Sequence, residues 1–223
     1  MTKLTSLQKR VLELLSESSL KDKFYWTGGT ALSTLYLHHR HSEDLDFFSD
    51  EAFSHNQVLS FVQELKSQLD LKKVEEKKIY DRWEFFVHNE EELRIEFVHY
   101  EHKNLKSRQD WKGIMVDSLE DIATNKTMTL FERNDPKDLV DLYFLLTEKD
   151  FTVEDLLKKT EQKFGVKFDE GSFWAESCRV LENLNDILPL LEAENEKERQ
   201  QIIENIKEYF SSHSTDYLDK ELQ

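Results

Sequence analysis

Two short runs indicate the fold of this chain: Phe24-Tyr25-Trp26-Thr27-Gly28-Gly29-Thr30 and Asp44-Leu45-Asp46-Phe47-Phe48. The first run is apolar and aromatic and stops at two glycines, which predicts a strand ended by a turn. The apolar spacing over residues 30–39 predicts a helix that opens directly after the glycines. The second run predicts another strand. Because side chains alternate on a strand, Asp44 and Asp46 would project to one side. The alternate residues, Leu45 and Phe47, would enter the core.

The sequence on either side predicts a mixed α and β part followed by a helical part. Helices are expected at residues 4–20 and 55–69, and strand-like stretches at 78–89 and 93–100. The later helices are expected at 119–131, 137–148, 153–164, 172–187 and 195–211. Asn134 or Asp135 would cap the helix at 137–148, with Pro136 in its first turn. The change from mixed structure to helices places a division near residue 115.

The charge of the chain restricts its partners. The 223 residues include 30 Lys and Arg and 46 Asp and Glu, so the formal net charge is −16. A nucleic-acid-binding protein usually has a basic surface, so an RNA partner would need a local basic patch. Two basic stretches with aromatic residues are candidates, although a solvated charged surface is the alternative for each. They are Lys72, Lys73, Lys77, Lys78, Arg82 and Trp83, and Lys103, Lys106, Arg108, Trp111 and Lys112.

The composition also indicates a cellular compartment. No run of about 18 apolar residues exists, and the first residues lack the apolar core of a signal peptide. Cys178 is the single cysteine, which argues against a disulfide framework and a paired-cysteine metal site. We therefore expect a cytoplasmic protein with no membrane partner.

The glycines and the two aspartates together predict a metal and phosphate site. Two carboxylates on one face of a strand repel each other unless a cation lies between them. Mg²⁺ favours hard oxygen ligands, usually one or two carboxylates together with substrate phosphates. Gly28 and Gly29 would expose backbone N–H groups at a helix N-terminus, which attracts an anion, and Thr30 could add a hydroxyl donor. The alternative is a turn followed by a solvated acidic strand.

Glu96 is a candidate for a third acidic group. In the run Arg94-Ile95-Glu96-Phe97-Val98, the apolar residues take one face and Glu96 takes the other. A neighbouring strand would place Glu96 beside Asp44 and Asp46, where it could ligate the metal or accept a proton. An exposed strand glutamate is the alternative.

Lys126 occupies an unusual position in the helix expected at 119–131. It lies at helical spacing from Ile122 and Ala123, within an apolar stripe, so its ammonium must reach solvent or meet an anion. The next helix carries Asp138 and Asp141 on a shared face. These residues suit either a catalytic role or a salt bridge to Lys126 or Arg133.

Taken in order, these motifs resemble a known family. They are Gly28-Gly29-Thr30-Ala31-Leu32, Arg40-x-Ser42-x-Asp44-Leu45-Asp46-Phe47-Phe48, Ile122-Ala123-x-x-Lys126 and Lys137-Asp138-Leu139-Val140-Asp141-Leu142-Tyr143. The set resembles the nucleotidyltransferase toxins of the AbiE/AbiG abortive-infection type (AbiEii-like), in the DNA polymerase β-like nucleotidyltransferase superfamily. The chain departs from the superfamily pattern in three places: Gly28-Gly29-Thr30 stands where Gly-Ser is frequent, Glu96 stands where Asp is usual, and Lys137-Asp138 stands where Arg-Asp is frequent.

The resemblance implies an α+β fold with a small mixed sheet flanked by helices. It implies a nucleotidyltransferase core over residues 1–115. Residues 116–223 would form a helical part that packs on the core and completes the active site.

The resemblance also implies site roles. Asp44 and Asp46, with Glu96, would hold Mg²⁺ or Mn²⁺. The phosphates of an NTP would bind at a set of donors: Gly28, Gly29, Thr30, Arg40, Ser42 and Lys126. Asp141 or Asp138 would assist as a base or an orienting group.

The implied acceptor is RNA, such as the 3′ end of tRNA, with a cognate antitoxin as a further partner and no DNA. Two alternatives stay open: a transferase acting on a small molecule such as an antibiotic, and a non-catalytic member that binds a nucleotide or a protein.

Overall fold

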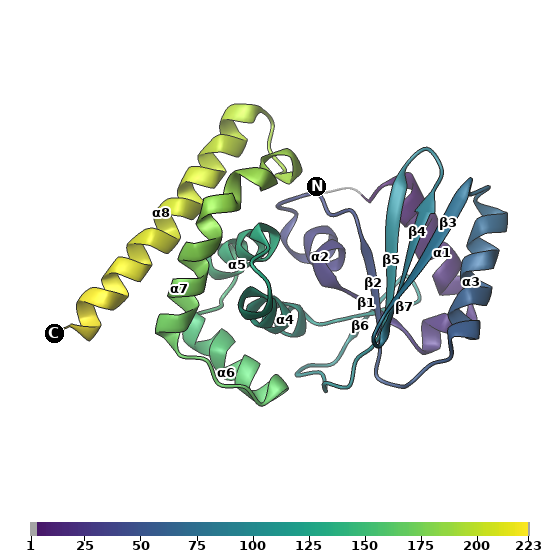
Figure 1. Ribbon diagram of the computed structural model, residues 1–223, viewed down its shortest axis with the longest axis horizontal. Helices are drawn as coiled ribbons and strands as arrows, with labels where there is room; N and C mark the ends of the chain where they lie inside the picture. Colours follow the sequence, from purple (N-terminus) through teal and green to yellow (C-terminus); the bar gives the residue numbers. More distant parts are fainter. Residues whose placement is uncertain (1–3, 223) are drawn as a thin grey trace. The chain divides into compact units, whose positions relative to one another are not determined.

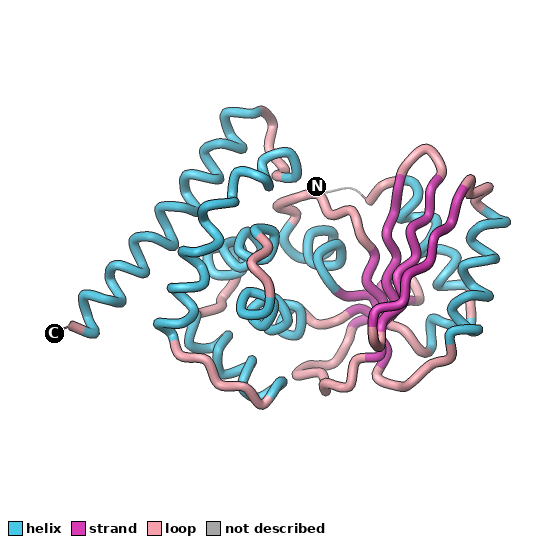
Figure 2. Tube along the Cα trace, in the orientation of Figure 1, coloured by secondary structure: helices cyan, strands magenta, loops and turns pink. Residues whose placement is uncertain are grey.

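The protein is described from a computed structural model, which describes residues 4–222. The chain divides into two compact units, Met1–Leu119 and Glu120–Gln223. The first contains all the strands found in the described residues, and the second is helical (Figures 1 and 2).

In the first unit, seven strands within residues 4–222 form one mixed sheet in the order β3-β4-β5-β2-β1-β7-β6. The strands are β1 (Tyr25–Thr27), β2 (Leu45–Ser49), β3 (Lys73–Ile79), β4 (Arg82–His88), β5 (Glu92–His99), β6 (Gln109–Trp111) and β7 (Ile114–Val116). The pairs β2–β5 and β1–β7 are parallel and the other neighbours are antiparallel. The expected mixed sheet is therefore confirmed.

The helices of the first unit are α1 (Ser6–Glu17), the 3₁₀ turn η1 (Ser19–Asp22), α2 (Gly28–Ala31), the π-helical η2 (Leu32–Leu37) and α3 (His55–Gln68). Figure 1 shows α3 along one side of the sheet and α2 on the other. Phe97 lies at the centre of the apolar face. Its ring centroid is 5.0 Å from that of Phe24, 5.4 Å from Phe47 and 6.2 Å from Phe85. These contacts bury the face of the sheet opposite the polar side chains of β2.

The turn after β1 leads directly into α2 and η2, which together run from Gly28 to Leu37. His38 ends this helix in a left-handed conformation with φ 56°. Wider π-helical turns are often found at functional sites, and here they follow the glycine pair.

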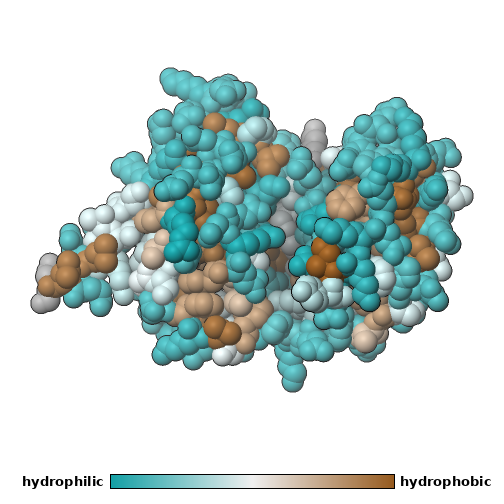
Figure 3. All heavy atoms as spheres, viewed as in Figure 1, coloured by the Kyte–Doolittle hydropathy of each residue, from teal (hydrophilic) through white to brown (hydrophobic). Residues whose placement is uncertain are grey.

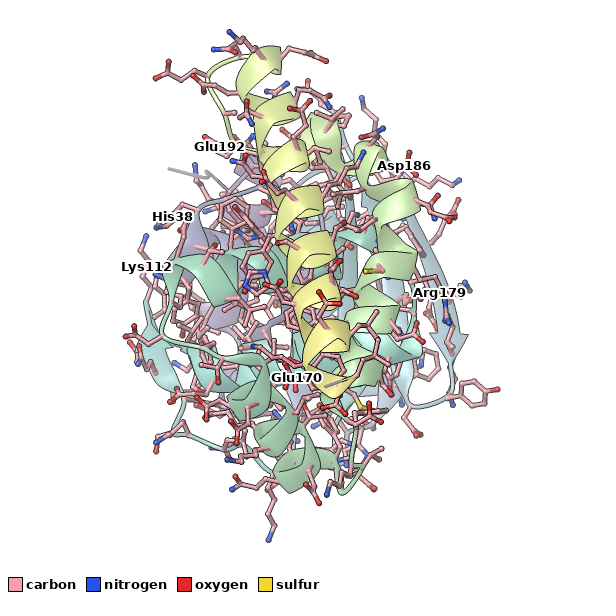
Figure 4. The ribbon with its side chains drawn as sticks, turned by 90° about the vertical axis from the view of Figure 1, so that its left-hand side faces the viewer. His38, Lys112, Glu170, Arg179, Asp186 and Glu192 are labelled. Atoms are coloured by element: carbon pink, nitrogen blue, oxygen red, sulfur yellow. The ribbon has the colours of Figure 1, made fainter. Side chains whose placement is uncertain are left out.

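The second unit contains α4 (Leu119–Glu132, whose first residue belongs to the first unit), α5 (Pro136–Glu148), α6 (Val153–Phe164), α7 (Glu170–Val180), the 3₁₀ segment η3 (Leu181–Leu190) and α8 (Glu196–Glu221). Asp135 caps α5 by accepting a hydrogen bond from the Lys137 N–H, with Pro136 in the first turn, as the sequence predicts. Figure 4 shows α8 running along α7, with its last turns near Glu170. Only Ile203, Ile206 and Phe210 of α8 are buried, which is one narrow stripe.

Several boundaries differ from the sequence-based predictions. The stretch expected at 78–89 is the end of β3, a turn and β4, and most of β3 was not predicted because five of its seven residues are charged. The short strands β6 and β7 were also not predicted. The helix expected at 172–187 breaks into α7 and η3 at Val180. The helix α8 continues to Glu221, beyond the expected end at residue 211, and its last turns have no buried residue that would have indicated them.

No helix in residues 4–222 has the length and apolar composition that would span a bilayer. On the face shown in Figure 3, hydrophilic side chains cover most of the surface and hydrophobic ones form small patches.

Candidate active site

The glycine turn and the Asp46 carboxylate are in direct contact. Gly28 has a left-handed φ of 76°, which favours glycine. A Cβ on Gly28 would overlap the Asp46 carboxylate, so only a residue without a side chain lets this carboxylate approach the turn. The contact follows from strand pairing, because Thr27 of β1 lies opposite Asp46 of β2.

The second glycine lies beside the other predicted phosphate donors. A Cβ on Gly29 would meet the Arg40 Nη2 at 2.8 Å and the Ser42 Oγ at 3.1 Å. The Thr30 hydroxyl donates to the Asp44 backbone carbonyl, which ties the start of α2 to the start of β2. The turn thus brings backbone N–H groups, a guanidinium and a hydroxyl to one place. Thr27, the N-cap of α2, makes no side-chain cap bond. This arrangement suits an anion.

Asp44 and Asp46 project from the polar face at the start of β2, while Leu45 and Phe47 are fully buried, as predicted. Asp44 Oδ2 accepts a hydrogen bond of 2.7 Å from Arg94 Nη2, and each side chain is about one third exposed. Burial alone would lower the pKa of Arg94. The hydrogen bond to Asp44 and the neighbouring carboxylates outweigh that effect and raise its pKa, so the guanidinium is charged.

A row of polar residues crosses the sheet at the level of Asp46. The strand register places Glu96 of β5 beside Asp46, Glu84 of β4 beside Glu96, and Lys77 of β3 beside Glu84. Glu84 and Glu96 are both nearly buried. Glu96 accepts a hydrogen bond of 2.7 Å from Arg82.

Arg94 also lies 3.5 Å from Glu84, and together with Arg82 it compensates the two nearly buried carboxylates. From the sequence, Arg82 is a candidate only as part of a basic stretch, and Glu84 is not singled out. The signal was present as two Arg-x-Glu motifs, at 82–84 and 94–96. On two antiparallel strands with the glutamates opposite each other, these motifs form crossed ion pairs.

The donor chemistry of Asp44 and Asp46 fits a hard divalent cation. Within residues 4–222, no three His, Cys, Asp or Glu side chains are grouped so that they could hold a metal ion. Mg²⁺ in proteins often takes only one or two carboxylates, with substrate phosphates completing its shell. The pair beside the glycine turn supplies those two carboxylates. A third ligand from Glu96 stays a prediction.

The second unit contains its own cluster of charges. Lys126 of α4 is nearly buried, and its Nζ lies 2.7 Å from Asp138 Oδ1 and 2.8 Å from Asp141 Oδ2, both on α5 and both fully buried. Arg133 Nε donates to Asp138 at 2.8 Å. Burial alone would raise the pKa of Asp138, but Lys126 and Arg133 outweigh it and hold this pKa below its ordinary value.

The predicted site residues therefore form two groups. Gly28, Gly29, Thr30, Arg40, Ser42, Asp44, Asp46 and Glu96 belong to the first unit, and Lys126, Asp138 and Asp141 belong to the second. The first group places donors that suit an anion beside carboxylates that suit a metal ion. The second is a salt-bridged triad that fixes α4 against α5.

Comparison with known proteins gives a family match over nearly the whole chain. The sequence model of a family described as "Nucleotidyl transferase AbiEii toxin, Type IV TA system" matches residues 10–221. An uncharacterized protein of Aquifex aeolicus (strain VF5) is 29% identical over 167 residues, which are 74% of this chain and 77% of that protein.

Two crystal structures from Helicobacter pylori have a similar fold. One, a candidate nucleotidyltransferase, superposes with a TM-score of 0.59 at 18% identity, covering 95% of this chain and 94% of its own. The other, JHP933, has a TM-score of 0.55 at 20% identity, covering 97% of this chain and 100% of its own. At these identities the likeness concerns the fold.

Proposed function

The chain belongs to the AbiEii nucleotidyl transferase toxin family, and from this we propose that it transfers a nucleotide from an NTP to an RNA acceptor. The proposal includes a requirement for Mg²⁺ or Mn²⁺ and a role as the toxin of a toxin–antitoxin system with a cognate antitoxin.

One observation carries the chemical part of this proposal: the contact between the Gly28 turn and the Asp46 carboxylate. Nucleotidyl transfer needs a place where phosphate oxygens and a divalent cation meet, because negative charge develops on the transferred group. In the proposal, Asp44 and Asp46 would hold the cation, and the cation would supply positive charge that neutralises the phosphates. Gly28, Gly29, Thr30, Arg40 and Ser42 bind and orient the phosphates.

The triad of the second unit would assist. Lys126 would pair with the nucleotide phosphates, and Asp141 or Asp138 would orient Lys126 or accept the proton of the attacking hydroxyl. The reaction is then an in-line displacement at the α-phosphorus. The acceptor oxygen forms a bond to phosphorus, pyrophosphate leaves, and the acceptor proton passes to a carboxylate or to water.

The proposed acceptor is the 3′ end of an RNA such as tRNA. A small-molecule acceptor is the second candidate, because the net charge of −16 opposes the approach of a polyanion.

The test is incubation of the protein with each of the four NTPs, labelled at the α-phosphate, together with total RNA and Mg²⁺. We expect label from at least one NTP to enter RNA of tRNA size. If no label enters RNA with any of the four NTPs, in Mg²⁺ or in Mn²⁺, the RNA proposal is contradicted.

A further inference from the structure

The β3–β4 hairpin ends in a residue that is unusual for its position. Ile79 pairs with Arg82, so the turn consists of Tyr80 and Asp81. Tyr80 has a φ of 51° and is 91% exposed. Hairpin turns that need a positive φ favour Gly, Asn or Asp, and an aromatic residue there is an outlier. The backbone at Tyr80 is thus strained while its ring is exposed. Strained backbone commonly marks a functional position.

The base of the hairpin is fixed by aromatic contacts. Trp83 stacks on His55, the first residue of α3, with ring centroids 4.0 Å apart and an interplanar angle of 26°. Lys78 lies over the same ring at 4.8 Å. These contacts hold the strands on both sides of the turn, so the Tyr80 ring is presented from a rigid support.

The turn end of the hairpin is also basic within an acidic chain. Residues 77–83 contain three basic and one acidic side chain, although the whole chain carries a net charge of −16. Lys77 and Arg82 project from the face that carries Asp46, and they are 62% and 46% exposed. The nearly buried Glu84 and Glu96 lie beneath them, with Glu84 3.9 Å from Lys77 and Glu96 2.7 Å from Arg82. The two carboxylates thus hold the positively charged Lys77 and Arg82 side chains at the edge of the polar face of the sheet.

The strand register connects this edge with the carboxylate pair. Glu84 lies in the same cross-strand row as Asp46, and β5 separates β4 from β2. Strand spacings place Tyr80 roughly 13 Å along β4 from that row, and the row itself spans about 10 Å from Glu84 to Asp46. A flexible strand of a few nucleotides covers such a distance.

From these observations we propose that the β3–β4 hairpin is a docking site for single-stranded RNA. Tyr80 stacks on a base, and Lys77 and Arg82 contact the phosphates that lead toward Asp46. Single strands present unstacked bases to an aromatic side chain, whereas the bases of a duplex are already stacked. The path of the RNA toward Asp46 rests on the proposed function, in which the docked strand is the acceptor.

The first test measures binding without catalysis. The full chain is titrated into a short, fluorescently labelled single-stranded RNA, and anisotropy is recorded for the wild type, Tyr80→Gly and Tyr80→Phe. Glycine suits the positive φ, so Tyr80→Gly should keep the fold and the melting temperature. We expect Tyr80→Gly to weaken binding at least about fivefold and Tyr80→Phe to bind nearly as the wild type does, because stacking needs only the ring.

The second test concerns charge. Lys77→Gln should lower the slope of log K against log salt concentration by about 0.7, the loss of one phosphate contact in a single strand. Lys77 is preferred to Arg82 because Glu84 keeps Arg94 as a partner, whereas Glu96 would lose its hydrogen bond from Arg82. Lys158→Gln, an exposed lysine of α6, is the matched control and should leave the slope unchanged.

Equal affinity of Tyr80→Gly and wild type, absence of RNA binding by the wild type, or an equal loss for double-stranded RNA would each overturn the hairpin proposal. Nucleotide transfer is measured separately with labelled NTP. If Tyr80 governs RNA binding but no label reaches RNA, the docking site stands and the proposed transfer to RNA fails. If label transfer occurs and Tyr80→Gly changes neither binding nor the KM for RNA, the hairpin proposal alone fails.

Discussion

At the scale of single residues, Gly28 meets two requirements. Its φ of 76° is strained for any residue with a side chain, and the Asp46 carboxylate occupies the position where a Cβ would lie. We expect Gly28→Ala to displace this carboxylate from the turn. Stability should fall because of the backbone strain, and NTP binding in the presence of Mg²⁺ should fall about tenfold or more because a proposed ligand of the charge-neutralising cation is misplaced. Thermal melting and a fluorescent-nucleotide titration measure the two effects.

Gly165 provides the matched control for Gly28. It has a φ of 70°, and a Cβ there would meet no atom within 4 Å. Gly165→Ala should therefore show the loss of stability without the loss of nucleotide binding. If Gly165→Ala and Gly28→Ala weaken nucleotide binding equally, the contact with Asp46 has no special role.

The sequence predicted the environment of a side chain correctly where the pattern of its own strand or helix decides whether it is buried. The alternation at Asp44-Leu45-Asp46-Phe47 correctly predicted the buried and polar sides of β2. The position of Lys126 in an apolar stripe indicated that its ammonium must reach solvent or meet an anion, and the structure shows the second. The pairing of Arg94 with Asp44 was not predictable, because it depends on which strands are neighbours.

At the scale of elements, α4 and α5 are joined by the buried triad of Lys126, Asp138 and Asp141. Lys126→Met keeps the length of the side chain and removes its charge. Two fully buried carboxylates would then lose a cation. We predict a loss of about 3–5 kcal/mol in the free energy of unfolding, measured by urea denaturation.

Lys158→Met is the control for the Lys126 substitution, because Lys158 is exposed and pairs with Glu154 on the surface. It should unfold as the wild type does. A Lys126→Met protein of unchanged stability would show that the triad contributes little to the packing of α4 on α5.

The triad also predicts a pH dependence. The pKa of Asp138 is lower in the folded protein than its ordinary value near 3.9. Its contribution to stability is therefore complete above about pH 4 and is lost as the pH falls through the folded-state pKa. We expect the difference in unfolding free energy between wild type and Asp138→Asn to be constant near neutral pH and to shrink in acid. A difference that does not vary down to the lowest pH at which the protein folds would contradict this assignment.

Elements with a strong apolar pattern were predicted within a few residues, as α3, α5 and α6 illustrate. The strand β3 was not, since an edge strand of the sequence Lys-Val-Glu-Glu-Lys-Lys-Ile has almost no apolar face. The turn at Tyr80 was missed because the residue with the positive φ is a tyrosine, whereas Gly, Asn or Asp usually indicates such a position in a sequence.

At the scale of the whole molecule, the order of the motifs was more informative than any motif alone. The glycine pair, the Asp-x-Asp strand and the Lys126 helix are each common. Together they indicated the AbiEii family, to which the match over residues 10–221 assigns the chain. Net charge was less informative, because the value of −16 hides the basic turn end of the hairpin at residues 77–83.

In the proposed mechanism, Asp44 and Asp46 form the metal site of the nucleotidyltransferase. The most direct measurement compares label transfer from α-labelled NTP by the wild type and by the double variant Asp44→Asn/Asp46→Asn, at equal protein concentration and with Mg²⁺. Melting curves check that the variant is folded. We predict that the wild type transfers label, that a chelator stops the transfer, and that the variant is slower by about a hundredfold or more. A folded double variant that transfers label at the wild-type rate would contradict the claim.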